Sequence, residues 1–216
     1  MAYKIRMQTT TNAEALQEVY RETGRHLLHD RAPSGYLSAL SHTPEFREHP
    51  FAMLHRLKST EQSPIHHPEG SAWNHTLLVV DAAANMREQS HDPAVFMWAA
   101  LLHDIGKPDT TRVRKRKITS YDHDTLGAEL GRKFLNEFTD DRLFIGRICA
   151  LIRYHMHILF VVNDLPFADM RGMLQHTDVS EVALLGLCDR LGRTNSDREK
   201  EEATIRLFLQ KCNRML

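Results

Sequence analysis

One short segment constrains the fold of this chain more than any other, Leu101–Pro108, which reads Leu-Leu-His-Asp-Ile-Gly-Lys-Pro. The apolar run Ala94–Leu102 leads into it and is typical of a buried helix, which the glycine and proline of the segment then end. Adjacent side chains rarely converge in mid-helix, but they can at a last turn, where the backbone begins to unwind. His103 and Asp104 stand at this point, and an imidazole beside a carboxylate is a ready pair of ligands for a divalent transition metal.

Two further ionisable residues lie in apolar helical patterns far from this segment. His75 lies on the inner face of the pattern Trp73–Asp81, and Asp189 lies in the pattern Ala183–Arg190. A carboxylate in an apolar run is costly to bury unless it is paired or bound to a metal. Taken singly, His75 also fits a core histidine, and the His-Asp doublet also fits a polar helix end. Taken together, they predict a metal site between core helices with four ligands: His75, His103, Asp104 and Asp189.

The order His, His-Asp, Asp resembles the HD-domain superfamily of metal-dependent phosphohydrolases, from roughly Pro64 to Arg193. Within that superfamily the chain is most similar to the HD domain of bacterial tRNA nucleotidyltransferases. There too a His-Pro-Glu-Gly segment, here His67–Gly70, leads into a helix reading Trp-x-His-Thr-Leu-Leu-Val-Val-Asp. A histidine followed by Gly-Ala, here His123 and then Gly127-Ala128, also comes after the doublet. The resemblance implies an all-α fold, an HD-domain helical bundle.

The resemblance also implies candidates for a second metal ion. In binuclear members of the superfamily, histidines between the doublet and the last aspartate bind the second ion, and His123 and His155 occupy such positions here. Asp104 would bridge the two ions, although His123 also fits a helix cap or a substrate contact. Imidazole and carboxylate ligands favour Mn, Fe, Co, Ni or Zn over Mg alone. We expect one ion, and two if both histidines contribute.

Such a site suits phosphate chemistry, because a divalent metal lowers the pKa of a bound water toward about 7 and offsets charge on a phosphoryl group. We expect Asp104 and Lys107 to be the catalytic residues, with Lys107 holding a phosphate oxygen. Three further residues are candidates for binding substrate: His157, Arg190 and Arg193. The positively charged residues Lys107, Arg190 and Arg193 also fit the last turn of a helix, where the helix dipole favours positive charge.

We therefore predict a metal-dependent phosphohydrolase, either a phosphomonoesterase or a phosphodiesterase. It would act through metal-activated water on a phosphorylated small molecule, a nucleotide or the end of a nucleic acid. The polymerase head of the tRNA nucleotidyltransferases, marked by a Gly-Ser segment with an Asp-x-Asp pair close behind it, is not recognisable, so CCA addition by this chain alone is not expected. The alternatives are a non-catalytic HD-fold regulatory or ligand-binding module, and a di-iron oxygenase.

The composition sets few further limits. The 216 residues carry 28 basic and 28 acidic side chains, so no overall field attracts nucleic acid or an anionic membrane. The three cysteines lack the spacing of a metal site and are expected to be buried free thiols in a cytoplasmic protein. The longest unbroken apolar run is too short to span a bilayer, so we expect no membrane partner.

We expect one compact unit, in which residues 1–60 form a helical extension packed on the core and residues 61–216 form the HD domain with its C-terminal helix. A capping box at Thr11–Glu14 predicts a helix to about His29, and two more helices are expected, a short one around Tyr36–Ser41 and another from Pro44 to about Leu57. This first part is the candidate for homodimer contacts.

The segment Asp109–Tyr121 is expected to be a flexible or hairpin-like loop. Five cations within Arg112–Lys117 either steer a phosphate-bearing substrate toward the site or are simply solvated.

Overall fold

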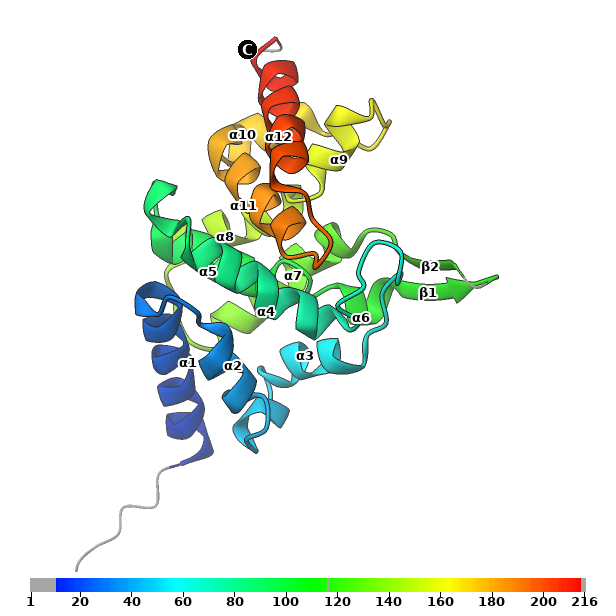
Figure 1. Ribbon diagram of the computed structural model, residues 1–216. Coiled ribbons are helices and arrows are strands. Elements are labelled where there is room, and N and C mark those ends of the chain that lie inside the picture. Colours follow the sequence, from blue (N-terminus) through cyan, green and yellow to red (C-terminus); the bar gives the residue numbers. More distant parts are fainter. Residues whose placement is uncertain (1–10, 116, 215–216) are drawn as a thin grey trace, which may run out of the picture.

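The computed structural model describes residues 11–115 and 117–214, and α5 (Pro93–Leu102) lies at its centre. Asp92 caps this helix by accepting a hydrogen bond from the Val95 N–H, and every residue from Val95 to Leu102 is buried. Three helices pack around α5 (Figure 1): α4 (Ala72–Ala84), α8 (Arg142–Tyr154) and α11 (Val179–Leu191). The prediction of an all-α fold is therefore confirmed.

The N-terminal helix α1 (Asn12–His29) begins at the predicted capping box, in which Thr11 and Glu14 exchange hydrogen bonds. Its Tyr20 ring stacks on Trp98 of α5 at 4.7 Å and on Phe138 at 4.5 Å between ring centroids. The short helix α2 (Ser34–Leu40) follows and packs against α4.

The single helix predicted between residues 44 and 57 is wrong. The segment is divided into η1 (Glu45–Arg47), α3 (Ala52–His55) and η2 (Arg56–Ser59). Pro50 lies inside the segment, and a proline in a helix interior removes a backbone donor and crowds the preceding turn. The inner face was nevertheless predicted correctly, because four of its residues are fully buried: Phe46, Phe51, Leu54 and Leu57.

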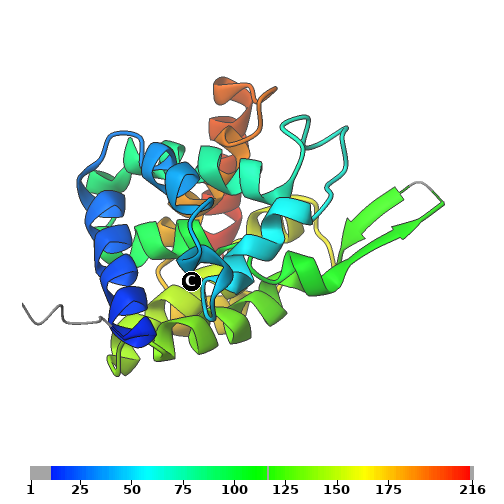
Figure 2. The ribbon, with the colours of Figure 1, turned by 90° about the horizontal axis from the view of Figure 1, so that it is seen from below.

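The segment after the His-Asp doublet forms a β-hairpin, the hairpin-like form of the predicted loop. Strand β1 (Thr111–Arg114) pairs antiparallel with β2 (Lys117–Ser120), so that Arg114 lies opposite Lys117. The hairpin projects from the helical body (Figures 1 and 2), and Arg116 of the predicted cationic segment lies outside the described residues. The remaining elements are η3 (Arg87–Gln89), α6 (Lys107–Thr110), α7 (His123–Asn136), which packs on α8, α9 (His157–Val162), α10 (Met170–His176) and α12 (Arg198–Asn213).

A close backbone contact sets the position of the doublet against α7. A Cβ atom added at Gly106 would collide with the carbonyl oxygen of His123 and lie 2.7 Å from the backbone nitrogen of Gly127. Only glycine leaves room for this approach. The contact brings the segment that carries the doublet beside the start of the helix that carries His123.

The stretch Arg142–Val162 has the length and hydropathy of a membrane-spanning helix, but 61% of its most apolar window is buried inside the molecule. It comprises α8 and α9 with a turn at His155, and core helices commonly meet the same criterion. All three cysteines are buried free thiols, as predicted: Cys149, Cys188 and Cys212.

Candidate metal centre

His103 and Asp104 follow directly after the last residue of α5, and each is only 1% exposed. The turn brings them together, with His103 Nε2 lying 3.2 Å from Asp104 Oδ2. The convergence expected at the end of the apolar helix is therefore observed.

Three of the four predicted ligands gather in one group. Nitrogen atoms of His75 and His103 and a carboxylate oxygen of Asp189 all lie within 4.8 Å of one another. His75 Nε2 is 2.9 Å from Asp189 Oδ1. These residues come from α4, the end of α5 and α11, three helices that are far apart in the sequence.

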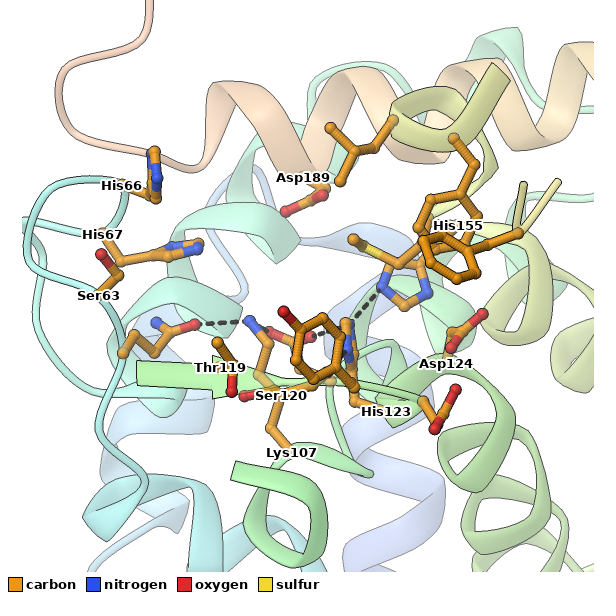
Figure 3. A pocket seen from close by; sticks show the side chains of 18 of the residues that line it. Ser63, His66, His67, Lys107, Thr119, Ser120, His123, Asp124, His155 and Asp189 are labelled. Atoms are coloured by element: carbon orange, nitrogen blue, oxygen red, sulfur yellow. Dashed lines mark hydrogen bonds and ion pairs between the residues drawn. The ribbon is translucent and has the colours of Figure 1, made fainter. Parts of the chain in front are cut away.

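The fourth predicted ligand, Asp104, belongs to a second group with His123 and His155, again within 4.8 Å. His123 Nε2 lies 3.6 Å from Asp104 Oδ1 and 3.2 Å from His155 Nε2 (Figure 3). The short contact between Asp104 and His103 joins the second group to the first. Asp104 thus occupies the position between the groups that was predicted for a bridging ligand.

Main-chain carbonyls orient three of the imidazoles. The Nδ1 atoms of His103, His123 and His155 donate to the carbonyl oxygens of Ala100, Ser120 and Ile152, at 2.9, 2.6 and 2.6 Å. A neutral imidazole that donates through Nδ1 carries a lone pair on Nε2. Each of the three rings therefore presents its acceptor nitrogen to the site, as metal-binding histidines do.

The donor atoms fit a divalent cation. The Nε2 atoms of His123 and His155 face each other at 3.2 Å although both rings already donate through Nδ1, so their lone pairs repel unless a cation or proton lies between them. His103 Nε2 is buried and makes no hydrogen bond within the described residues, whereas buried polar atoms are normally satisfied. Mixed nitrogen and oxygen donors suit a transition metal.

The carboxylates of the centre are held in their charged form. Burial alone would raise the pKa of Asp104, but the neighbouring His103 and Lys107 hold it well below its usual range. Burial opposes ionisation of Asp189 too, yet its hydrogen bond with His75 and the nearby Arg193 keep its pKa well below the usual value. Both carboxylates are therefore available as ligands at neutral pH.

The histidines of the second group are held neutral. Burial and the neighbouring His155 lower the pKa of His123 to about 4, and burial together with His103 lowers that of His155. His75 differs, because its hydrogen bonds to Asp189 and Glu69 outweigh burial and raise its pKa. Neutral imidazole is the form that binds metal, so the second group needs no loss of protons before an ion can enter.

Sequence reasoning missed Glu69, which holds His75 from the side away from Asp189. Glu69 Oε1 lies 2.9 Å from the Nδ1 atoms of both His67 and His75, and the Glu69 side chain is only 3% exposed. A carboxylate that accepts from the second nitrogen of a ligand histidine fixes the orientation of its ring. The His-Pro-Glu-Gly segment before α4 was the signal that marked this residue.

Lys107 lies beside the doublet, as predicted. Its Nζ atom donates to Gln62 Oε1 at 2.6 Å and lies 2.7 Å from Asp104 Oδ2 (Figure 3). Arg193 also lines the site, with its guanidinium 3.8 Å from Asp189 Oδ2. Arg190 lines it too, but its guanidinium is paired with Glu201 at 3.1 Å, which leaves it less free to bind a substrate.

The structure does not support the substrate-binding role predicted for His157. This side chain is completely buried, and its Nε2 accepts a hydrogen bond from the Asp169 N–H at 3.1 Å. His157 is absent from the walls of the site, whereas His155 is among them. His155 follows the last residue of α8 and His157 begins α9, and of the two only His155 reaches the pocket.

A pocket of about 500 Å³ opens over the centre, within the range of small-molecule sites. Asp104, His123, His155 and Asp189 all contribute to its walls. Lys107 and the start of α7 close another part of the pocket (Figure 3). A ligand in this pocket would therefore meet both groups of donor atoms.

Comparison with known proteins gives a consistent assignment. The family model of the HD domain matches residues 72–193, which contain both groups. The multifunctional CCA protein of Actinobacillus pleuropneumoniae serotype 5b is 32% identical over 112 residues, 50% of this chain and 26% of that protein. The protein of the same name from Methylococcus capsulatus is 27% identical over 210 residues, 96% of this chain and 43% of its own length.

The chain thus spans between about a quarter and less than half of these two curated relatives. Their name agrees with the resemblance to tRNA nucleotidyltransferases noted from the sequence. HD domains bind divalent metals, and both groups of donor atoms lie within the matched residues, while Glu69 and His67 lie just before them. On the arrangement of its helices, its His-Asp doublet and this match over more than half its length, the chain belongs to the HD-domain family.

Proposed function

We propose that this protein is a metal-dependent phosphohydrolase that cleaves a phosphate ester of a nucleotide or of a nucleic-acid end. The observation that carries the proposal is the pair of donor groups joined at Asp104, on the wall of a pocket that also holds Lys107. Ligands for two cations beside a buried ammonium group form a site that favours a phosphoryl group.

One ion would be held by His75, His103, Asp104 and Asp189, and a second by Asp104, His123 and His155. The ligand types favour Mn, Fe, Co, Ni or Zn. A bound ion of this kind supplies a Lewis acid for a phosphoryl oxygen and a water of lowered pKa.

The protein's own residues would then place the ester. Lys107 is held by Gln62 and Asp104 but remains on the pocket wall, where its charge attracts a phosphoryl oxygen. Arg193 offers a second cation beside Asp189. Because these groups are already oriented, little reorganisation is needed when negative charge increases on the phosphoryl group.

The likeness to multifunctional CCA proteins supports a nucleotide or nucleic-acid end as the substrate. The test is phosphate release from adenosine 2′-, 3′- and 5′-monophosphates, and ring opening of adenosine 2′,3′-cyclic phosphate, with each candidate metal in turn. Asp104→Asn should abolish turnover, while Asp140→Asn, an exposed aspartate on the loop before α8, should leave it unchanged.

A folded, metal-loaded protein that hydrolyses none of these esters would contradict the proposal and favour a binding module. Oxygen consumption by an iron-loaded sample would favour an oxygenase instead.

A further inference from the structure

The pocket has an apolar wall that the phosphate chemistry does not use. Five side chains from the turn before α9, from α9 itself and from the loop after it form this wall: Met156, Leu159, Phe160, Leu165 and Phe167. The wall starts close to the metal centre, because Met156 follows His155 directly and both residues line the pocket. Tyr121, at the base of the hairpin, also lines the pocket.

Several of these side chains are exposed, so packing of the core does not explain them. Tyr121 is 71% exposed, Phe167 63% and Leu159 39%. Phe167 meets Phe160 edge to face, with ring centroids 5.7 Å apart. Single exposed apolar residues are ordinary, but a group of them around one pocket marks a binding surface.

The chemistry of the wall selects its occupant. Aromatic faces bind flat π-systems by stacking, whichever ring the partner carries. Polar groups at the same pocket, including the hydroxyls of Thr119 and Thr125 and the carboxylate of Asp122, can meet the hydrogen-bonding edge of such a ring.

We propose that the apolar wall is a nucleobase subsite, where the base of a nucleoside phosphate stacks on Phe160, Phe167 and Tyr121 while its phosphate lies at Asp104. The inference rests on the proposed function for the position of the phosphate. It goes further by assigning the side chains that would bind the base, Phe160, Phe167 and Tyr121, which the phosphate chemistry does not use.

Two ligands that differ only in the base test the subsite directly. Calorimetry of the purified full chain would compare adenosine 5′-monophosphate with ribose 5-phosphate, and the 2′- and 3′-monophosphates would extend the series. Loss of one base stack corresponds to about a 5- to 150-fold weakening of binding. The wild type should therefore bind the nucleotides at least about tenfold more tightly than ribose 5-phosphate.

Phe167→Ala and Tyr121→Ala should each remove much of that difference while leaving the affinity for ribose 5-phosphate unchanged. Phe167→Trp should preserve it, because a larger aromatic ring still stacks. Leu143→Ala is the matched control, since Leu143 is 80% exposed and does not line the pocket. All of these positions are exposed, so the variants are expected to fold.

Equal affinity of the wild type for the nucleotides and ribose 5-phosphate would overturn the inference. Nucleotide affinity that neither alanine variant lowers would overturn it as well. These outcomes are separate from a failure of the proposed function, which would appear as absence of hydrolysis. The binding measurements report the contribution of the base whether or not the protein hydrolyses the ester.

Discussion

Orientation of the ligand histidines depends on atoms that no side-chain substitution removes. His103, His123 and His155 each donate to a main-chain carbonyl three residues earlier. His75 is the exception, because its Nδ1 atom meets the carboxylate of Glu69. Mutation of a neighbouring side chain should therefore disturb the orientation of His75, whereas the other three rings keep their main-chain partners.

Removing His123 should reduce the number of ions bound. With His123→Ala the second group loses one of its three donors, while the first group keeps all of its own. We expect the metal content to fall from two ions to one per chain, as measured by elemental analysis after dialysis against a weak chelator. An unchanged stoichiometry would contradict the binuclear arrangement.

Glu69→Gln should weaken metal binding without unfolding the protein. The amide keeps the size of the side chain but loses the charge that holds His67 and His75, and the hydrogen bonds with these rings hold the pKa of Glu69 at about 2 despite its burial. Loss of such an outer partner typically lowers metal affinity about 10- to 100-fold. Competition with a fluorescent chelator would measure the change, and circular dichroism would report on the fold. Wild-type affinity in the variant would show that Glu69 does not position His75.

At the scale of elements, the contact between the doublet and α7 depends on the absence of a side chain at Gly106. Gly106→Ala should cost about 3 kcal/mol, because the new methyl group meets backbone atoms of His123 and Gly127 that cannot turn away. Gly146→Ala is the matched control, since nothing lies within 4 Å of a Cβ atom at that position of α8. It should stabilise the protein by about 0.5–1 kcal/mol.

Urea denaturation of both variants would measure these changes in the free energy of unfolding. Gly106→Ala should also lose metal, because the doublet and His123 move apart. A Gly106→Ala protein as stable as Gly146→Ala would mean that the two segments separate at little cost.

The hairpin carries positive charge that the rest of the described protein does not neutralise. Arg114 lies opposite Lys117, and neither of them makes an ion pair within residues 11–115 and 117–214. Like charges opposite each other on a hairpin are unfavourable, so an anionic partner would stabilise this arrangement. Thr119 and Ser120 of β2 line the pocket, which connects the hairpin to the site.

Reversing both charges, with Arg114→Glu and Lys117→Glu, should raise KM for an oligonucleotide ester about tenfold and leave kcat little changed. It should also make KM less sensitive to salt, because screening acts on the attraction that the wild type loses. Arg206→Glu on α12 is the control for net charge. If KM and its salt dependence both stay at wild-type values, the hairpin is a solvated loop.

For the molecule as a whole, the buried thiols predict how stability responds to alkali. Burial raises the pKa of Cys212 to about 11, whereas the pKa of an exposed thiol is about 8.5. As the pH rises between these values, the unfolded chain loses the Cys212 proton while the folded protein keeps it. Folding stability from this group is therefore complete below pH 8.5 and declines toward pH 11.

Urea denaturation at pH 8 and pH 10 would test this, with Cys212→Ala as the comparison. The variant should lose less stability than the wild type between the two pH values. An identical loss in both proteins would show that Cys212 ionises equally in the folded and unfolded states.

The sequence allowed accurate prediction at several places where the signal was local, although the single helix predicted over 44–57 was wrong. The end of α5 was predicted because an apolar run meets a glycine and a proline, and α1 because Thr11 and Glu14 form a capping box. Prediction failed where the role of a residue depends on the direction in which its side chain points in the folded protein. Glu69 reaches His75 only because its loop folds back over α4, and His157 resembles His155 in sequence position alone.

Because main-chain carbonyls orient the three imidazoles, the geometry of the candidate metal centre does not depend on the side chains of the pocket wall. Side chains such as Phe167 belong to a wall that takes no part in holding His103, His123 or His155. Substrate preference can therefore be retuned by mutagenesis of that wall while the reactive corner keeps its geometry. Under the proposed phosphohydrolase function, libraries at the aromatic positions, rather than around the histidines, would be the route to new substrate selectivity on this scaffold.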